Sequence, residues 1–332
     1  LEVLETEGLG IIMVADNHNK LLGTVTDGDI RRALMLQKDA NTLLEDIMRK
    51  NPFTISVEHS REQVISIMKQ ERILQLPVVD EHGVIVDLEM ITNTLDVERR
   101  ENIVFLMAGG FGTRLKPLTD DTPKPLLMIG DKPILEIILD QFIESGFHNF
   151  IISTHYKASM LHEYFGDGSK WGINIEYVHE ESPIGTAGAL GLLKKNITNL
   201  PILVMNGDLL TKVDFDSFLN FHNSNTGIAS ICVREYDMQV PYGVVNSSNH
   251  KLTGIVEKPI NKYFVNAGIY IINPSLLESL DGKTYLDMPD LLQQQVNNDF
   301  EVNVFPLHEY WLDIGHLENL KQAKRDSKNI FR

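Results

Sequence analysis

Short apolar runs separated by polar turns fill the amino-terminal part of the chain. Residues 11–16 and 21–26 each predict a strand, joined by a turn over residues 17–20. Residues 27–37 then predict a helix, with Asp27 as its N-cap. We therefore expect the order strand, turn, strand, helix.

Part of this order recurs about 64 residues later, where residues 75–80 and 84–88 predict two strands joined by a tight turn. Between the two repeats, residues 53–57 predict a strand. Residues 60–71 predict a helix that opens with a capping-box pattern. Internal repeats of this size usually pack as a pair, because each alone buries too little apolar surface.

The pattern changes after a polar segment at residues 96–102, which is the natural linker. Residues 103–107 form a continuous apolar run, typical of a strand buried on both faces. Helical patterns occur at residues 134–145 and 187–194. Further apolar runs occur at residues 150–153, 173–178, 202–205, 228–233 and 268–272. Strands that alternate with helices predict an α/β domain over residues 103–332, with a Rossmann-like, mostly parallel sheet behind an α+β pair of repeats.

Composition narrows the function classes. The 332 residues carry a net charge of −16, which repels nucleic acid and anionic membranes. No apolar run approaches the roughly 20 residues of a membrane span. The single cysteine, Cys232, lies in an apolar run and predicts a buried strand thiol. A cytoplasmic protein without disulfides is expected, and the chain lacks an initial Met, so we expect some amino-terminal sequence to be missing.

The strongest chemical signal is the segment LMAGGFGTRLKPLTDDTPKPLL, residues 106–127. Its glycines follow a predicted strand directly, so backbone N–H groups can approach phosphate oxygens without obstruction. Arg114 supplies a planar, permanently charged fork suited to phosphate. Lys124 lies between Pro123 and Pro125 on a stiff segment, as a positioned cation requires.

Two other phosphate-binding loops do not fit this segment. A Walker A loop needs Gly-x-x-x-x-Gly-Lys-Ser/Thr, a string that the sequence lacks. A dinucleotide-binding loop needs a third glycine three residues after the second, but Leu115 follows Gly112 at that spacing.

The segment resembles the signature of the sugar-1-phosphate nucleotidyltransferases, and the resemblance extends through essentially all of residues 103–332. It also covers residues 181–190, Asn206-Gly-Asp208, Glu257-Lys-Pro259, Asn266-Ala-Gly268 and residues 311–315. The resemblance implies a nucleotide site at Ala108, Gly109, Gly110, Gly112, Thr113, Arg114, Gly185 and Thr186. It implies sugar-phosphate contacts at Asn206, Glu257, Lys258, Asn266 and Gly268.

A magnesium site is expected at Asp208 and Asp313. Asp208 follows the apolar run at residues 202–205, and ligands of open α/β sheets bind where strands end. Alone, Asp208 could form a turn and Asp313 could cap a helix. Beside a phosphate loop, both are better interpreted as hard oxygen ligands for Mg²⁺. Arg114, Lys124 and Asp208 are then the expected catalytic residues.

The amino-terminal repeats resemble CBS modules, which commonly bind adenine nucleotides and often dimerise. The resemblance assigns residues 1–50 to a truncated first module and residues 51–98 to a second. Gly23-Thr-Val-Thr-Asp-Gly-Asp29 carries the match, and it implies Thr26 and Asp29 as contacts of a regulatory nucleotide.

The second repeat departs from this pattern at Asp87, Met90 and Asn93. The alternative is a pair that serves only packing and association, and a homo-oligomer formed through the pair is expected.

The implied reaction joins a nucleoside triphosphate to a sugar 1-phosphate and releases pyrophosphate. A CBS pair ahead of this catalytic type resembles the guanylyltransferases of bacterial nonulosonic (legionaminic) acid pathways, which act on glucosamine 1-phosphate. GTP is therefore favoured, with dTTP or UTP on glucose 1-phosphate as the alternative. A nucleotide-sensing protein without catalysis is the competing class, although a sensor has no need of metal-binding carboxylates.

Overall fold

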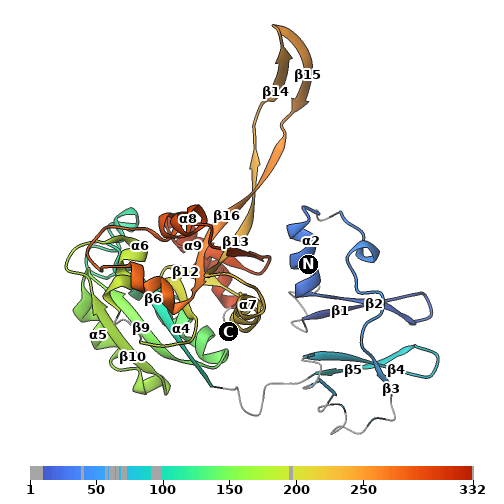
Figure 1. The fold of residues 1–332 in the computed structure, drawn as a ribbon, viewed down its shortest axis with the longest axis horizontal. Coiled ribbons are helices and arrows are strands. Elements are labelled where there is room, and N and C mark those ends of the chain that lie inside the picture. The colour runs from blue at the N-terminus through green and yellow to red at the C-terminus, as the bar shows by residue number, and fades with distance from the viewer. Residues whose placement is uncertain are drawn as a thin grey trace. The chain divides into compact units, whose positions relative to one another are not determined.

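A computed structural model describes residues 10–38, 41–56, 59, 64, 67–68, 73–90, 99–193 and 197–330. The chain forms two compact units, residues 1–96 and 97–332 (Figure 1). Among the described residues, the structure contains no helix that is both long enough and apolar enough to cross a membrane.

The amino-terminal unit contains the predicted strands in two small sheets. β1 pairs with β2 in one sheet, and β3, β4 and β5 form the other in that order. The elements are β1 (Ile11–Ala15), β2 (Leu21–Thr26), α2 (Asp27–Met35), η1 (Leu44–Asp46), β3 (Ile55–Ser56), β4 (Gln75–Val79) and β5 (Ile85–Met90).

The two repeats use the same turn, which explains their shared sequence pattern. Asp16 accepts hydrogen bonds from the backbone N–H groups of His18 and Lys20, at 2.8 and 2.9 Å. Asp80 accepts them from His82 and Val84, both at 2.9 Å. The two turns also join, through an antiparallel bridge between Lys20 and Val84. The predicted pairing of the repeats is therefore confirmed.

The start of α2 differs from the prediction. Thr26, and not Asp27, is the N-cap residue, with extended backbone angles. The carboxylate of Asp29 accepts hydrogen bonds from the backbone N–H of Thr26 at 2.9 Å and from its hydroxyl at 2.8 Å. Asp29, the third residue of the helix, thus completes a capping box with Thr26, and the N-cap lies one residue before the predicted position.

The predicted helix at residues 60–71, with its capping box, falls mostly outside the described residues, as does Asn93.

The carboxy-terminal unit is built on one seven-stranded sheet with the order β10-β9-β6-β11-β16-β13-β17. Its strands are β6 (Arg100–Met107), β9 (Phe147–Thr154), β10 (Asn174–His179), β11 (Ile202–Asn206), β13 (Ala229–Gln239), β16 (Ile260–Ile272) and β17 (Val302–Leu307). β16 runs antiparallel to β11 and β13, whereas the other neighbouring pairs are parallel. The predicted α/β class with a mostly parallel sheet is confirmed.

β6 begins at Arg100, so the last residues of the predicted linker already belong to the sheet. Ile103, Val104, Phe105 and Leu106 are all buried, as a strand covered on both faces requires.

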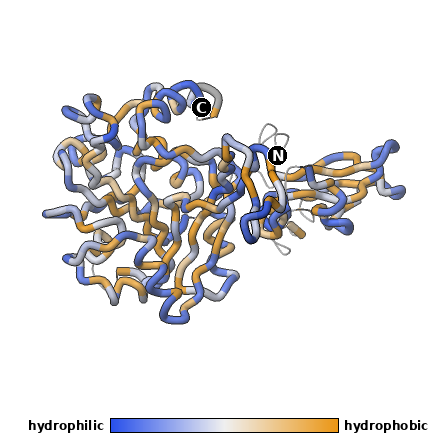
Figure 2. Tube along the Cα trace, turned by 90° about the horizontal axis from the view of Figure 1, so that it is seen from above, coloured by the Kyte–Doolittle hydropathy of each residue, from blue (hydrophilic) through white to orange (hydrophobic). Residues whose placement is uncertain are grey.

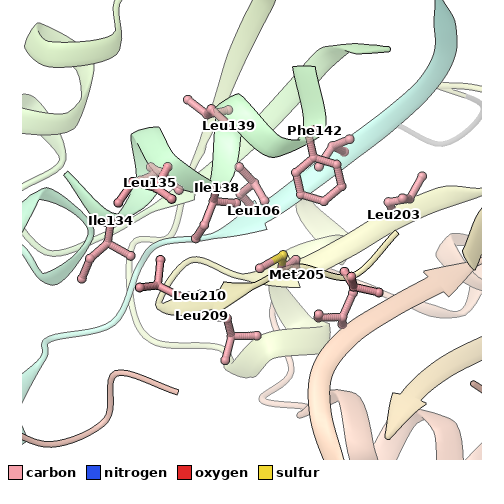
Figure 3. Packing of buried hydrophobic residues seen from close by; sticks show 14 of the residues in the cluster. Leu106, Ile134, Leu135, Ile138, Leu139, Phe142, Leu203, Met205, Leu209 and Leu210 are labelled. Carbon is pink, nitrogen blue, oxygen red and sulfur yellow. The ribbon is translucent and has the colours of Figure 1, made fainter. Parts of the chain in front are cut away.

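α4 (Ile134–Glu144) covers one face of this sheet, and its apolar residues form a stripe at helical spacing. Ile134, Ile138 and Phe142 lie over β6 and β11, against residues that include Leu106 and Met205 (Figure 3). Full burial of one such side chain stabilises the fold by about 1.5–3 kcal/mol. Apolar residues follow the strands, and polar residues prevail on the outer loops (Figure 2).

The remaining elements surround the sheet. The helices are α5 (Ala158–Phe165), α6 (Gly185–Gly188), α7 (Phe215–Ser224), α8 (Met288–Asn297) and α9 (Leu317–Ile330). Short strands are β7 (Met128–Ile129), β8 (Lys132–Pro133), β12 (Leu209–Thr211), β14 (Gly243–Ser248), β15 (Lys251–Glu257) and β18 (Trp311–Asp313). Short 3₁₀ helices are η2 (Thr113–Leu115), η3 (Lys124–Leu126), η4 (Ser169–Trp171), η5 (Ala189–Leu192) and η6 (Pro274–Ser279).

Candidate active site

The parallel strands bring the predicted site segments to one edge of the sheet. Asn206, the last residue of β11, lies beside Met107, the last residue of β6. The backbone N–H of Gly207 donates to the Met107 carbonyl at 2.8 Å. A side chain at Gly207 would collide with that carbonyl, since a Cβ there would lie 2.8 Å from its oxygen. The glycine-rich loop and the Asn206–Asp208 turn therefore start from adjacent positions.

The glycine-rich loop closes on itself at Gly112, whose φ of 64° is in the left-handed region. The Thr119 hydroxyl donates to the Gly112 carbonyl at 2.8 Å. A Cβ at Gly112 would lie 2.9 Å from Thr119 and 3.2 Å from the Cβ of Lys124. Space is open above Gly110, by contrast, because a Cβ there would meet no atom of another segment within 4 Å. The loop thus leaves its exposed side free for a phosphate group.

Three other residues of the predicted nucleotide site, Ala108, Thr113 and Arg114, belong to the same loop. Ala108 is buried, and its backbone N–H donates to the Ser153 carbonyl at 3.1 Å. Thr113 and Arg114 form the short turn η2, from which the Arg114 side chain extends in an exposed position. Arg114 is therefore accessible to an anionic ligand.

Lys124 begins the turn η3, with prolines on both sides. Its ammonium group forms an ion pair with the carboxylate of Asp208. The lysine side chain is only 13% exposed, and its Cβ lies close to Gly112 of the glycine-rich loop. Two residues 84 positions apart in the sequence, both predicted from motifs, are in direct contact.

Asp208 and Asp313 come from two segments that pair with each other. Leu209 of β12 lies opposite Asp313 of β18, and the Ile314 N–H donates to the Asp208 carbonyl at 3.0 Å. Crowding by surrounding atoms raises the pKa of Asp313, although solvent still reaches this side chain. The negative charge of Asp208 raises the pKa further.

Positive groups oppose this shift: the charges of Lys124, Arg114 and His316 all lower the pKa of Asp313. The other three residues of the predicted catalytic and metal-binding set, Arg114, Lys124 and Asp208, therefore all act electrostatically on Asp313. Two mutually repelling carboxylates, with one partly desolvated, suit a divalent cation. Their oxygen donors fit the hard ion Mg²⁺.

Thr186 and Gly185 have structural partners close by. Gly185 has a φ of 80°, and a Cβ there would lie 2.4 Å from the Leu286 carbonyl oxygen. The Thr186 hydroxyl donates to Asp287 at 3.2 Å and accepts from the Met288 N–H at 2.8 Å. These contacts fix the segment to the start of α8. A nucleotide contact from Gly185 or Thr186 stays a prediction.

Asn206, Asn266 and Gly268 lie together beside β12. Asn266 accepts a hydrogen bond from the Gly268 N–H at 2.9 Å and donates one to the Tyr270 hydroxyl at 2.7 Å. Gly268 has a φ of 72°, and a Cβ there would lie 2.6 Å from the amide nitrogen of Asn206. Gly268 is needed so that Asn206 can lie this close to the β16 backbone.

Glu257 and Lys258 are placed differently from the other predicted sugar-phosphate residues. They lie at the end of β15, on a long hairpin that extends away from the helices of the unit (Figure 1). Both side chains are exposed, and Lys258 has a left-handed φ of 47°. The structure does not bring them to the cluster around Asp208.

Thr26 and Asp29, predicted to bind a regulatory nucleotide, are engaged with each other at the start of α2. Asp29 is buried and also forms an ion pair with Arg32 at 2.9 Å. These contacts suit the packing alternative at least as well as a nucleotide site.

Glu180 was not predicted from the sequence, although it adjoins the glycine-rich loop. It is buried, and its carboxylate would meet a Cβ at Gly109 at 2.6 Å. Its backbone carbonyl lies 2.6 Å from Nδ1 of His155, the residue that directly follows β9. Its position in the sequence could have identified it, because Glu180 directly follows β10 at the same edge of the sheet.

Comparison with known proteins identifies a family for each of two regions of the chain. The nucleotidyl transferase family model matches residues 103–329, and the CBS domain model matches residues 44–87. The mannose-1-phosphate guanylyltransferase catalytic subunit beta of Drosophila melanogaster is 35% identical over 222 residues, which cover 63% of this chain and 58% of that protein. The mannose-1-phosphate guanyltransferase of Schizosaccharomyces pombe is 31% identical over 218 residues, covering 63% of this chain and 60% of that protein. The chain thus spans less than two thirds of the length of these relatives.

Solved structures show the same fold. HddC from Yersinia pseudotuberculosis complexed with GMP-PN matches with a TM-score of 0.54 and 26% identity, over 68% of this chain and 99% of that one. A UDP-glucose pyrophosphorylase complexed with UDP-glucose matches with a TM-score of 0.54 and 20% identity, over 68% of this chain and 98% of that one.

Proposed function

The chain belongs to the nucleotidyl transferase family, and on that premise we propose that it transfers a nucleotidyl group from a nucleoside triphosphate to a sugar 1-phosphate, releasing pyrophosphate. The observation that carries this proposal is the convergence of Arg114, Lys124, Asp208 and Asp313 beside an open glycine-rich loop. A protein that only senses nucleotides has no use for the two carboxylates.

The proposed reaction requires no general base, because the attacking oxygen belongs to a phosphate that is already anionic. The residues therefore act by alignment and by neutralising charge. The loop amides and Arg114 hold the triphosphate and stabilise the charge that develops on the departing pyrophosphate. Lys124 holds phosphate near the reacting phosphorus.

Mg²⁺, held by Asp208 and Asp313, would reduce the repulsion between the reacting phosphates. Asn206 lies two residues before Asp208, and Asn266 is hydrogen-bonded to Gly268, which lies against Asn206. Both asparagines are proposed to contact the sugar phosphate. Glu257 and Lys258 are proposed to join them only after the hairpin that carries them changes position.

GTP is the proposed nucleotide, supported by the guanylyltransferase names of both relatives and by the GMP-PN complex of HddC. Two sugars are candidates. The CBS-like pair favours glucosamine 1-phosphate through its resemblance to nonulosonic acid enzymes, and the names of the relatives favour mannose 1-phosphate. dTTP or UTP with glucose 1-phosphate is the remaining alternative.

Pyrophosphate release with Mg²⁺ identifies the substrates. Each of GTP, dTTP, UTP, CTP and ATP is tested against glucosamine, mannose and glucose 1-phosphates. The proposal expects release with GTP and either glucosamine or mannose 1-phosphate. Release with dTTP or UTP and glucose 1-phosphate would replace the proposed substrates, while retaining the reaction class. Folded protein that is silent with every pair would overturn the reaction itself.

A regulatory nucleotide at Thr26 and Asp29, association through the CBS-like pair and a cytoplasmic location stay proposals of the sequence. The first of these is supported by the match of the CBS domain model, although the matched residues, 44–87, do not include Thr26 or Asp29.

A further inference from the structure

The segment that carries two of the predicted nucleotide residues, residues 184–188, lies against the part of the chain that directly precedes α8. Backbone hydrogen bonds join the two segments. Leu286 donates its N–H to the Ile184 carbonyl at 2.9 Å. The Leu286 carbonyl accepts from the N–H groups of Ala187 and Gly188, both at 2.9 Å. A turn that the sequence assigns to nucleotide binding is therefore held by a segment that the sequence assigns to no site.

Three glycines at intervals of three residues allow this close packing. They are Gly185, Gly188 and Gly191, in α6 and η5. A Cβ at any of the three would lie 3.0 Å or less from backbone atoms of the facing segment, at Leu286, Thr284 and Gly282 respectively. The two segments therefore pack backbone against backbone at three places.

Two side chains fasten the segments at the start of α8, and each caps the helix that the other belongs to. The Thr186 hydroxyl accepts a hydrogen bond from the N–H of Met288, the first residue of α8, at 2.8 Å. The carboxylate of Asp287 accepts one from the N–H of Thr186, the second residue of α6, at 3.0 Å. Because the first N–H groups of a helix have no partner within it, each bond satisfies a group that would otherwise lack one. We call these two hydrogen bonds the crossed caps.

The crossed caps use Asp287 in an uncommon way. Asp287 is the N-cap residue of α8, yet its side chain makes no capping bond to α8. Its carboxylate accepts instead from the N–H of Thr186, at a distance of 101 positions in the sequence, and from the Tyr285 hydroxyl at 2.9 Å. The side chain therefore serves the turn at Thr186 and not its own helix.

The same contacts occupy the Thr186 hydroxyl. It donates to the Asp287 carboxylate at 3.2 Å and accepts from Met288, which uses its single donor and one of its two lone pairs. Donation from this hydroxyl to a nucleotide would break its bond with Asp287. The side chain of Thr186 is therefore better suited to fastening the turn than to donating to a ligand.

We propose that Asp287 is a positioning residue, which holds the turn at Gly185 and Thr186 in the conformation that binds nucleotide. The proposal rests on the proposed function and on the nucleotide contacts predicted at this turn, which the backbone of the turn then makes. A turn that is already held in its bound conformation loses less conformational entropy when a ligand binds, so the affinity is higher. Without Asp287, the Thr186 N–H loses its partner and the turn opens more often.

Hydrogen exchange on the full chain tests the positioning without any ligand. In Asp287→Ala, the amides of Ala187 and Gly188 are expected to exchange at least about fivefold faster than in the wild type. Asp287→Asn should stay close to the wild type, because its amide oxygen can still accept from the Thr186 N–H. Asp290→Ala is the control, since Asp290 is exposed and lies in the same first turn of α8.

Equal exchange in Asp287→Ala and the wild type would overturn the proposal. Circular dichroism checks that each variant is folded. Thr186→Val, which removes the hydroxyl and keeps the shape of the side chain, breaks the crossed caps from the other segment. It is expected to speed exchange in the same amides, and it decides the question if Asp287→Ala does not fold.

Nucleotide affinity tests the consequence for binding. Calorimetry uses Mg²⁺ and GTP, or the triphosphate that the substrate panel selects, without a sugar phosphate. Asp287→Ala is expected to raise the Kd about 10-fold, whereas Asp287→Asn and Asp290→Ala should leave it nearly unchanged. In turnover, the KM for the triphosphate should rise similarly while kcat stays within about threefold of the wild type. Partial unfolding would instead lower kcat through a smaller active fraction and leave KM unchanged.

The outcomes separate this proposal from the proposed function. Faster exchange in Asp287→Ala with an unchanged Kd would overturn the role of Asp287 in nucleotide binding. A wild type that binds a triphosphate but releases no pyrophosphate would contradict the proposed reaction alone, and a raised Kd in Asp287→Ala would still support the positioning role. A wild type that binds none of the five triphosphates would overturn both.

Discussion

Lys124 and Asp208 form an ion pair between the glycine-rich loop and the end of β11. The ammonium group of Lys124, which we propose as a phosphate-binding group, thus contacts the carboxylate of Asp208, which we propose as a metal ligand. On this proposal, Mg²⁺ and Lys124 compete for Asp208 until a triphosphate binds and offers Lys124 another partner. Metal and nucleotide binding should consequently favour each other.

Replacing Lys124 by Gln should tighten metal binding in the absence of nucleotide. Mn²⁺, which can be followed by electron paramagnetic resonance, is expected to bind about five-fold more tightly, the effect of losing a partly exposed ion pair worth about 1 kcal/mol. Lys132→Gln, which removes the ion pair with Asp140 at the surface, is the matched control and should leave Mn²⁺ affinity unchanged. Unchanged or weaker Mn²⁺ binding in Lys124→Gln would argue against competition for Asp208.

Asp313→Asn should stabilise the metal-free protein at neutral pH. Because the pKa of Asp313 is raised in the folded state, the folded protein holds this proton more tightly than the unfolded chain. Stability therefore falls as the pH rises from the ordinary value of 3.8 through the raised pKa. Solvent access limits the effect to about 1 kcal/mol or less, hence a Tm increase of up to about 4 °C at pH 7.

The gain should shrink as the pH is lowered toward 3.8, as measured by thermal unfolding across the pH range. Asp299→Asn is the control, since Asp299 is exposed and its left-handed φ of 63° suits Asn equally well. A gain that is the same at every pH would contradict the electrostatic explanation.

Two glycines of the same loop should respond differently to alanine. Gly112→Ala introduces a side chain at a left-handed φ, against Thr119 and Lys124, and should cost about 1–2 kcal/mol of folding free energy. Gly110→Ala meets no atom within 4 Å and should leave the stability nearly unchanged. Urea unfolding of both variants measures the difference. Equal stabilities would mean that the loop is not held closed at Gly112.

A nucleotide bound at the CBS-like pair should depend on Thr26 and not on the catalytic residues. Calorimetry with AMP is expected to give a binding signal that Thr26→Ala abolishes and Lys124→Gln retains. Thr26→Ala also loses the capping hydroxyl at a cost of about 1 kcal/mol, so its folding is checked first. Two results together would leave the pair with the packing role alone. The wild type would not bind AMP, and Thr26→Ala would not change the binding of ATP, GMP or GTP.

The sheet was predictable where the sequence repeats one pattern. Continuous apolar runs located β6, β9 and β11, since a strand buried on both faces has few polar positions. The direction of β16 was not predictable, because an apolar run looks the same in a parallel and an antiparallel strand. The long hairpin that β13, β14, β15 and β16 form was missed for a related reason, as only the inner ends of β13 and β16 are apolar runs.

In the site, the motifs located Lys124 and Asp208, but their contact depends on how the chain folds over the 84 residues between them. The engagement of Thr186 by Asp287 spans 101 residues and has no local signal. Lys258 shows that a clear motif does not fix a position, because the structure places this residue on the long hairpin, at the end of β15.

Single-turnover pyrophosphate release, compared between the wild type and Asp208→Asn, tests the central claim most directly. With Mg²⁺, GTP and the sugar 1-phosphate identified by the substrate panel, the wild type should release pyrophosphate only when both substrates are present. Folded Asp208→Asn should be at least about 100-fold slower, the scale of losing one electrostatic contact in the transition state. A variant that retains near-normal turnover, or a wild type that binds GTP without releasing pyrophosphate, would contradict the account.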